Sequence, residues 1–282
     1  MNKFATLSTG ARLEYAEAGP GGGTPIVFLH GVTDSWRSFE RVLPLLPPSV
    51  HAFAVSQRGH GESTRPQTGY RLTDLSDDLD AFLDVVGAER AVVVGHSWGA
   101  SVAQRFAVDH QVRVCALVLV GAFANVYHEP SLTDFFNAVL AGLADPIDRT
   151  FVRAWQLGTL AHRMPADHLE RVIAETLKVP ARVWKAAFAG FLETPDFSAR
   201  LRDVRVPTLM LWGDRDVFSN REAQDRLLDL IPGARLAVYE RAGHALHWED
   251  PLRFTRDLMA FLSERLTTGE PTPHEHGVVA AV

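Results

Sequence analysis

Short apolar runs that alternate with stretches of helical periodicity dominate the first half of this 282-residue chain. The runs lie at residues 4–7, 12–16, 26–29, 51–56, 91–94 and 116–120, and helical spacing is expected at residues 36–46, 72–86 and 100–108. This alternation is typical of strand–helix units. It predicts an α/β fold with a mostly parallel central sheet that is flanked by helices.

The alternation stops at about residue 122, and the next stretch is helical and rich in aromatic residues, without a convincing strand. It resumes with strands expected at 207–212 and 235–239 and helices at 221–230 and 252–265. The sequence therefore predicts a core made of residues 1–121 and 204–266, with an inserted helical cap at 122–203. The tail at 267–282 is rich in Pro, Gly and His and is expected to be disordered.

Charge and composition argue against several classes of partner. The net charge is −6 with no basic stripe, so nucleic acid is not an expected partner. No apolar stretch is long enough to cross a bilayer, and the first residues lack the apolar region of a signal peptide. The single cysteine, Cys115, lies in an apolar run and is expected to be a buried structural thiol. We expect a soluble cytoplasmic protein, while the oligomeric state stays open.

The central motif is Gly95-His96-Ser97-Trp98-Gly99, a G-x-S-x-G pattern that follows an expected strand and precedes an expected helix. A serine hydroxyl is a poor nucleophile, so it needs exposure, a nearby base and a site for the developing oxyanion. A sharp strand-to-helix turn supplies the exposure, and small flanking residues avoid clashes there. Ser97 is therefore the candidate nucleophile.

A second motif, Leu29-His30-Gly31-Val32, directly follows the apolar run at 26–29. In folds of this class, the loop after that strand donates a backbone N–H to the oxyanion, and the residue after the nucleophile donates another. The amides of Val32 and Trp98 are the candidate oxyanion donors. The first amides of a helix also carry a favourable dipole for a negative charge.

Two further segments supply an acid and a base. Asp214 and Asp216 follow the run at 207–212, at an edge where α/β sheets place their ligands, and either could orient a histidine. His244 and His247 follow the last expected strand, and we favour His244, which comes directly after Gly243. Histidine suits the role of base because its pKa lies near neutrality. The chain order Ser, Asp, His is that of α/β-hydrolases.

On these motifs the chain resembles the α/β-hydrolase superfamily, in its capped esterase, dehalogenase and epoxide-hydrolase branch. The resemblance extends from His30-Gly31 through Arg58-Gly-His-Gly-Glu-Ser63 to Gly243-His244. It includes the G-x-S-x-G turn at Ser97, which is called the nucleophile elbow in this superfamily. It implies that Asp216 is the acid, that His60 belongs to a structural turn, and that the insertion is a cap. An acid from the stretch after the preceding strand is unavailable, because residues 121–125 contain no carboxylate.

The enzymes of this branch catalyse different reactions, and a few residues of this chain distinguish between them. Dehalogenases and epoxide hydrolases have Asp at the elbow, where this chain has Ser97, and the insertion holds one tyrosine, Tyr127, instead of a pair. C–C bond hydrolases often have Trp after the catalytic histidine, where this chain has Ala245. We therefore expect a serine esterase or lactonase. A C–C hydrolase, a cofactor-free perhydrolase of the haloperoxidase type, a lyase and a small-molecule receptor remain alternatives.

The expected substrate is a small, largely apolar molecule, because the insertion is rich in aromatic side chains. The candidate binding residues are His30, Gly31, Phe123, Tyr127, Trp155, Trp184 and Phe188, although aromatic residues of this kind can also simply attach the cap to the sheet. The proposed chemistry uses no cofactor and no metal ion. His274 and His276 in the tail could bind a metal adventitiously.

Overall fold

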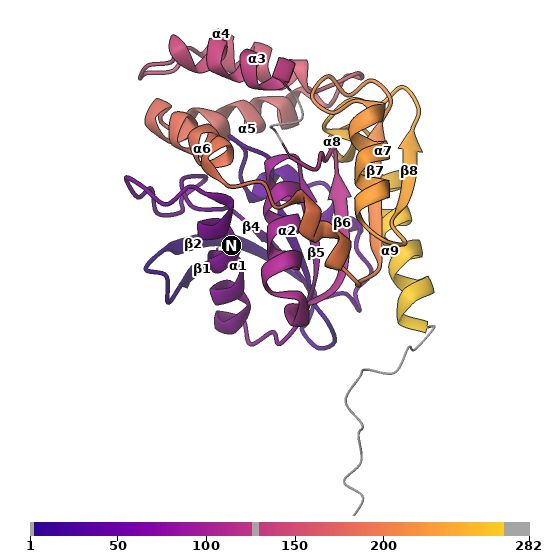
Figure 1. The fold of residues 1–282 in the computed structure, drawn as a ribbon. Helices are drawn as coiled ribbons and strands as arrows, with labels where there is room; N and C mark the ends of the chain where they lie inside the picture. Colours follow the sequence, from indigo (N-terminus) through magenta and orange to yellow (C-terminus); the bar gives the residue numbers. More distant parts are fainter. Residues whose placement is uncertain (1–2, 126–129, 268–282) are drawn as a thin grey trace, which may run out of the picture.

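The protein was analysed as a computed structural model that describes residues 3–125 and 130–267 (Figure 1). Its strands form one sheet in the order β1-β2-β4-β3-β5-β6-β7-β8. Only β1 and β2 run antiparallel to their neighbours, so the sheet is mostly parallel, as predicted. The strands are β1 (Lys3–Thr6), β2 (Arg12–Ala18), β3 (Ile26–Leu29), β4 (Ala52–Val55), β5 (Ala91–His96), β6 (Val114–Val120), β7 (Thr208–Gly213) and β8 (Arg235–Tyr239).

Helices cover both faces of this sheet because the strands are apolar on both sides. Along β3, Val27 and Leu29 belong to one apolar cluster, and Ile26 and Phe28 belong to another. The first cluster contains residues of α1 (Leu72–Val85), α2 (Trp98–Asp109) and α7 (Arg221–Leu230). The second contains residues of α8 (Leu246–Glu249) and α9 (Pro251–Thr267). Successive side chains of a strand point to opposite faces of the sheet, and here both faces are buried. The fold therefore has three layers, with the sheet between two layers of helices.

Four helices between β6 and β7 lie beyond the carboxyl ends of the parallel strands, at the top of Figure 1. They are α3 (Pro130–Ala141), α4 (Arg149–Gly158), α5 (Ala166–Leu177) and α6 (Ala181–Glu193), and we call them the cap helices. Among residues 122–125 and 130–203 there is no strand, in line with the helical and aromatic-rich pattern of this stretch.

Two local expectations were wrong. The expected helix at 36–46 is a pair of 3-10 turns, η1 (Trp36–Phe39) and η2 (Leu43–Leu45). Pro44 has no N–H to donate to the carbonyl four residues earlier, so an α-helix cannot continue through it. Cys115 is half-buried, because it lies near the start of β6 and packs only partly against the second apolar cluster.

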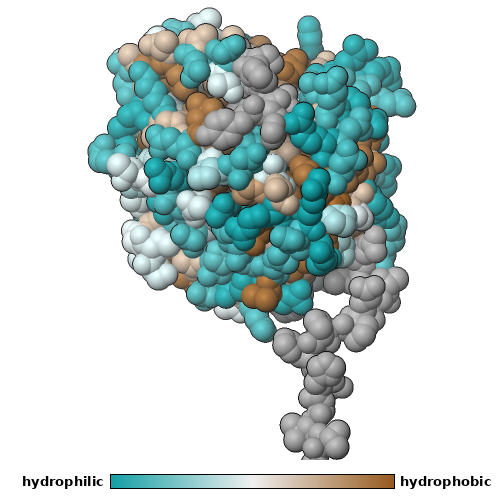
Figure 2. All heavy atoms as spheres, in the orientation of Figure 1, coloured by the Kyte–Doolittle hydropathy of each residue, from teal (hydrophilic) through white to brown (hydrophobic). Residues whose placement is uncertain are grey.

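Hydrophilic residues cover most of the face shown in Figure 2, and hydrophobic residues are scattered among them. Within the described part of the chain, no helix combines the length and apolar character that a membrane crossing requires. The expectations for the tail, including His274 and His276, concern residues 268–282, which lie outside the described residues.

Candidate active site

Loops after β3, β5, β7 and β8 meet at one edge of the sheet because these strands, with β6 between β5 and β7, are parallel and in register. Leu29 of β3 pairs with Gly95 of β5, and His96 pairs with Val120 of β6. Val120 in turn pairs with Leu211 of β7. The segments that follow β3, β5, β7 and β8 carry the candidate residues, so they leave the sheet from the same side. This edge is where open α/β sheets bind ligands.

Ser97 lies at a sharp turn between β5 and α2, with backbone angles φ 54° and ψ −119°. A positive φ is unfavourable for a residue with a side chain and costs on the order of 1–3 kcal/mol. The turn needs glycines on both sides, because a Cβ at Gly95 would lie 2.3 Å from the carbonyl oxygen of Gly99, and a Cβ at Gly99 would lie 2.3 Å from that of Leu29. The G-x-S-x-G pattern is thus explained by close backbone packing.

His244 and Asp216 form a buried pair. His244 Nδ1 donates to Asp216 Oδ2 at 2.8 Å, and the exposed fractions of their side chains are 3% and 0%. Asp216 also accepts hydrogen bonds from the amides of Phe218 and Ser219 and from the Ser219 hydroxyl. Burial opposes ionisation of Asp216, but His244 and these hydrogen bonds outweigh it and lower the pKa of the carboxyl. An ionised Asp216 keeps the proton of His244 on Nδ1, so Nε2 can act as an acceptor.

The two alternatives from the sequence have different surroundings. Asp214 is exposed and accepts a hydrogen bond from the amide of Arg241. His247 is fully buried, stacks on Phe39 and shares a hydrogen bond with the hydroxyl of Ser38. Neither residue lines the cavity that contains Ser97, whereas His244 lines it and is hydrogen-bonded to Asp216. The geometry therefore favours Asp216 and His244.

The backbone amides of Val32 and Trp98 lie in the two segments that flank Ser97. Trp98 is the first residue of α2, and neither amide donates a hydrogen bond to a protein group within the described ranges. The Val32 loop is held by the cap, since Trp155 Nε1 of α4 donates to the hydroxyl of Thr33 at 3.2 Å. Thr33 has a φ of 74°, which is rare for a β-branched residue. Both amides are thus available to a ligand.

A cavity of about 570 Å³, including its open mouth, lies between the sheet edge and the cap helices. Ser97 and His244 both line it, although no hydrogen bond joins the Ser97 hydroxyl to His244 in the described structure. Such catalytic contacts are often long when no substrate is bound. The cavity is lined by Gly31, Val32, Asp34, His96, Ser97, Trp98, Phe123, Phe136, Trp155, Gln156, Thr159, Phe188, Phe191, Phe218, His244 and Trp248.

The candidate binding residues divide into two groups. Among those predicted from the sequence, the cavity is lined by Gly31, Phe123, Trp155 and Phe188. Trp184 lies outside the lining, where it is fully buried, contacts Trp155 and donates to the carbonyl of Val179. His30 also lies outside it, with its ring nitrogens bonded to the carbonyl of Gly31 and the amide of Gln57. Tyr127 lies outside the described residues.

Sequence reasoning missed several residues of the lining. Phe136 and Phe191 belong to the same aromatic-rich stretch as the predicted residues, so composition alone could not separate them from Trp184. Asp34 lies two residues after Val32, and its position in the loop that carries a candidate oxyanion donor was an available signal. Nothing in the local pattern around Gln156 indicates that it faces the cavity.

No group of three or more His, Cys, Asp or Glu side chains is placed to hold a metal ion in the described part of the chain. The polar groups around Ser97 include its hydroxyl, the His244–Asp216 imidazole–carboxylate pair and the backbone amides of Val32 and Trp98. These are the groups that nucleophilic acyl transfer requires.

A family model described as the alpha/beta hydrolase family matches residues 26–258 of this chain. The protein belongs to the alpha/beta hydrolase family. The matched range runs from β3 to α9, so it includes the complete sheet edge and all of the segments that form the candidate site.

Relatives of this alpha/beta hydrolase include hydrolases of several kinds. A 2-hydroxy-6-oxononadienedioate/2-hydroxy-6-oxononatrienedioate hydrolase of Pseudomonas putida is 29% identical, over 93% of this chain and 96% of the relative. A hydrolase from Pseudomonas aeruginosa PA01 has a similar structure, with a TM-score of 0.80 and 25% identity over 93% of this chain and 98% of that one. An esterase from Exiguobacterium antarcticum superposes with a TM-score of 0.79 at 21% identity, covering 93% of this chain and 100% of the esterase, which shows a shared fold.

Proposed function

We propose that this protein is a serine hydrolase that cleaves a carboxylic ester or lactone of a small, largely apolar molecule through an acyl-enzyme on Ser97. The observation that carries the proposal is that the candidate nucleophile and the candidate base line one cavity. Ser97 and His244 line the same space, His244 is hydrogen-bonded to the buried Asp216 behind it, and Ser97 stands at the N-terminus of α2.

In the proposed reaction, Ser97 Oγ attacks the substrate carbonyl while His244 Nε2 takes its proton. The amides of Val32 and Trp98 donate hydrogen bonds to the oxyanion of the tetrahedral intermediate. His244 then gives the proton to the leaving alcohol, and the acyl group stays on Ser97. A water molecule deprotonated by His244 releases the acid and regenerates the hydroxyl. Asp216 holds the imidazole in the required tautomer and stabilises its charged form.

The lining of the cavity supports an apolar or aromatic substrate. Phenylalanine and tryptophan side chains from the segment after β6, the cap helices and the loop after β7 line the cavity together with Ser97 and His244. Apolar pockets with a few convergent polar groups are typical of small-molecule sites. The likeness to the E. antarcticum esterase is compatible with this proposal and adds no detail about the substrate.

The decisive experiment is a panel of p-nitrophenyl esters of graded acyl length, together with lactones, run on the wild type and on Ser97→Ala. We expect turnover of at least one ester class by the wild type and a decrease in kcat of roughly 10³-fold or more in Ser97→Ala, with the fold retained. Circular dichroism checks the fold. A variant that keeps more than about a tenth of the wild-type rate would contradict Ser97 as the nucleophile.

A second candidate is hydrolysis of a carbon–carbon bond next to a ketone. The specific observation in its favour is the P. putida relative, whose name is that of a 2-hydroxy-6-oxo-dienedioate hydrolase. Ala245 after His244 is unlike the tryptophan that such enzymes often have there. Turnover of a 2-hydroxy-6-oxo-dienoate, with rates on the ester panel near background, would favour this candidate over the esterase.

A further inference from the structure

Two ionisable side chains of the cavity lining have no part in the proposed reaction. Asp34 follows the Val32 loop, and His96 directly precedes Ser97. Both line the cavity, and their exposed fractions are 5% and 2%. A buried polar group costs free energy unless it is hydrogen-bonded, so each of them needs an explanation.

The surroundings of Asp34 make it a neutral hydrogen-bond donor. Gln156 Nε2 of α4 donates to Asp34 Oδ1 at 3.1 Å and to the hydroxyl of Thr176, which gives its own proton to the carbonyl of Val172. Burial raises the pKa of Asp34 to about 8, although Gln156 and Ser38 partly oppose that shift. Since Oδ1 accepts from Gln156, the proton of the neutral carboxyl belongs on Oδ2.

His96 offers a hydrogen-bond acceptor. Its Nε2 lies 3.1 Å from the carbonyl oxygen of His244, and because a carbonyl only accepts, Nε2 carries the proton. Burial and the neighbouring His244 lower the pKa of His96 to about 3, so the ring is neutral near pH 7. Nδ1 is then an unprotonated nitrogen with a lone pair. It is buried and has no hydrogen-bond partner among the described residues.

The Asp34 donor and the His96 acceptor both lie beside the Cα of Gly31, which carries no side chain. A Cβ built at Gly31 would lie 3.0 Å from His96 Nδ1 and 3.3 Å from Asp34 Oδ2. These distances are too tight for an ordinary Cβ contact, so the position favours glycine, and both polar atoms approach Gly31 from the side where a Cβ would stand. Because Gly31, Asp34 and His96 all line the cavity, a group bound beside Gly31 would meet both side chains, close to the Val32 amide.

We propose that Asp34 and His96 form a polar subsite that binds a hydroxyl group of the substrate next to the reacting carbonyl. A hydroxyl oxygen accepts a hydrogen bond from Asp34 and donates one to His96 Nδ1, so it satisfies both groups at once. A ketone or ether oxygen only accepts, and an ammonium group only donates, so each would leave one partner unpaired. This inference rests on the proposed function for the identity of the reacting carbonyl.

Binding and hydrolysis of matched esters test this subsite. The pairs are ethyl mandelate with ethyl phenylacetate, ethyl 3-hydroxy-3-phenylpropanoate with ethyl 3-phenylpropanoate, and 2-hydroxyethyl phenylacetate with propyl phenylacetate. The methyl ether of ethyl mandelate serves as an acceptor-only analogue. Binding is measured by tryptophan fluorescence in a Ser97→Ala background, since Trp98, Trp155 and Trp248 line the cavity. Hydrolysis by the protein with Ser97 intact is measured by pH-stat titration.

We expect the hydroxyl-bearing ester of at least one pair to bind about tenfold more tightly than its partner. The methyl ether should lose that advantage. Asp34→Leu should reduce the preference to within about twofold, because it removes the donor at similar volume. Asp34→Asn should keep most of the preference, because its neutral amide still donates and can still accept from Gln156.

The outcomes separate the subsite from the proposed function. Equal binding within all three pairs, equal binding of the methyl ether, or an undiminished preference in Asp34→Leu would overturn the subsite, even if plain esters are hydrolysed. A preference that depends on Asp34, in a protein that hydrolyses no ester or lactone, would support the subsite and overturn the esterase proposal. If Asp34→Leu does not fold, the methyl ether comparison still decides.

Discussion

Asp214 and Asp216 are two residues apart on one loop, yet their side chains meet different surroundings. Asp216 is enclosed and bonded to His244, whereas Asp214 is exposed and contacts the backbone of Arg241. Hydrogen bonds to a buried charged group are stronger than those at the surface. The choice between the two residues therefore depends on burial and on the partner, not on the residue type.

Asp216→Asn should lower kcat far more than Asp214→Asn. Asparagine at 216 keeps the Oδ1 acceptor for the amides of Phe218 and Ser219, so the loop should fold. It places an NH₂ group opposite His244 Nδ1, which favours the wrong tautomer. We expect a loss of roughly 10²–10⁴-fold for Asp216→Asn and a rate close to wild type for the matched Asp214→Asn. Steady-state kinetics on the best ester of the panel gives both values, and the reverse ranking would move the role to Asp214.

Asp34 should make stability depend on pH. Its pKa is raised from 3.8 to about 8, so the folded state holds this proton more tightly than the unfolded state does. The stabilisation is fully present below about pH 4 and is lost as the pH rises through about 8. Asp34→Asn stays neutral at every pH. Its free energy of unfolding should therefore exceed that of the wild type increasingly between pH 4 and pH 8.

Urea titrations of both proteins at several pH values measure this effect. Each unit of pKa shift corresponds to about 1.4 kcal/mol, so the gap should reach a few kcal/mol at pH 8. His96, whose pKa is lowered from 6.5 to about 3, makes stability fall below about pH 6.5, but it does so in both proteins, so its effect cancels in the gap between them. A gap that is constant from pH 4 to pH 8 would show that Asp34 is ionised throughout.

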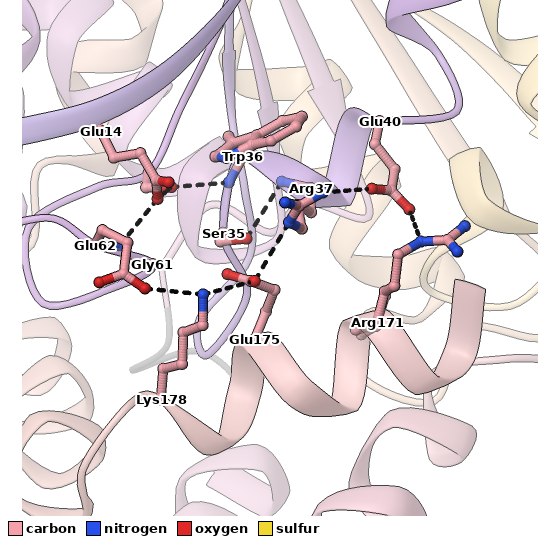
Figure 3. A network of polar contacts seen from close by, with 12 residues as sticks. Glu14, Ser35, Trp36, Arg37, Glu40, Gly61, Glu62, Arg171, Glu175 and Lys178 are labelled. Carbon is pink, nitrogen blue, oxygen red and sulfur yellow. Dashed lines mark hydrogen bonds and ion pairs between the residues drawn. The ribbon is translucent and has the colours of Figure 1, made fainter. Parts of the chain in front are cut away.

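At the scale of elements, a polar network joins the cap to the core beside the cavity (Figure 3). Glu40, which follows η1, accepts hydrogen bonds from Arg171 and His168 of α5 and from Arg37. Glu175 and Lys178 continue the network from α5 toward Glu62. Because η1 comes shortly after the Val32 loop, these contacts hold α5 against the segment that carries a proposed oxyanion donor.

Glu40→Gln should weaken this connection at neutral pH. Burial opposes ionisation of Glu40, but hydrogen bonds from His168 and Arg171 outweigh it and lower its pKa from 4.5 to about 2. The carboxylate therefore contributes stability above pH 4.5, and that contribution is lost as the pH falls through about 2. We expect Glu40→Gln to lower the free energy of unfolding by about 1 kcal/mol at pH 7, since its arginine partners are partly exposed and screened by water.

Urea unfolding at pH 7 and pH 3 checks the expectation for Glu40. The gap between wild type and variant should be smaller at pH 3. Glu170→Gln on the same helix is a matched control, because Glu170 pairs with Arg149 and Arg153 at the surface, where all three side chains are about half exposed. A larger loss from Glu170→Gln than from Glu40→Gln would contradict the importance of the buried network.

At the scale of the whole molecule, the cap helices and the sheet share one apolar cluster. It contains Trp184 of α6 and Val152 of α4 together with Phe106 of α2 and Leu29 of β3. Elements that bury their apolar faces against each other cannot unfold separately without exposing both. The cap and the core should therefore unfold in one cooperative transition.

Thermal unfolding followed by far-ultraviolet circular dichroism and by tryptophan fluorescence tests this cooperativity. We expect coincident midpoints. Trp184→Leu, which removes volume from a fully buried position, should lower the single midpoint and leave one transition. Two separated transitions in either protein would mean that the cap is an independent folding unit.

The sequence alone determined the fold class and the position of the elbow, for a local reason. Strand and helix periodicity, and the small residues that a sharp turn requires, depend on neighbours in the chain, so they can be recognised without coordinates. Gly95 and Gly99 are necessary because the turn from β5 into α2 brings backbone carbonyl oxygens too close for a Cβ at either position. The 3-10 turns at η1 and η2 were missed because the prediction followed the helical spacing up to Pro47 and did not take Pro44 into account.

Only the tertiary structure decided which side chains meet. Trp155 faces the cavity and Trp184 lies behind it, although both are cap tryptophans in similar sequence surroundings. Asp34, His96 and Gln156 come together from a loop, a strand and a cap helix. The lining of a cavity and the charge state of a buried carboxyl depend on packing between segments distant in the chain, and local periodicity contains no information about that packing.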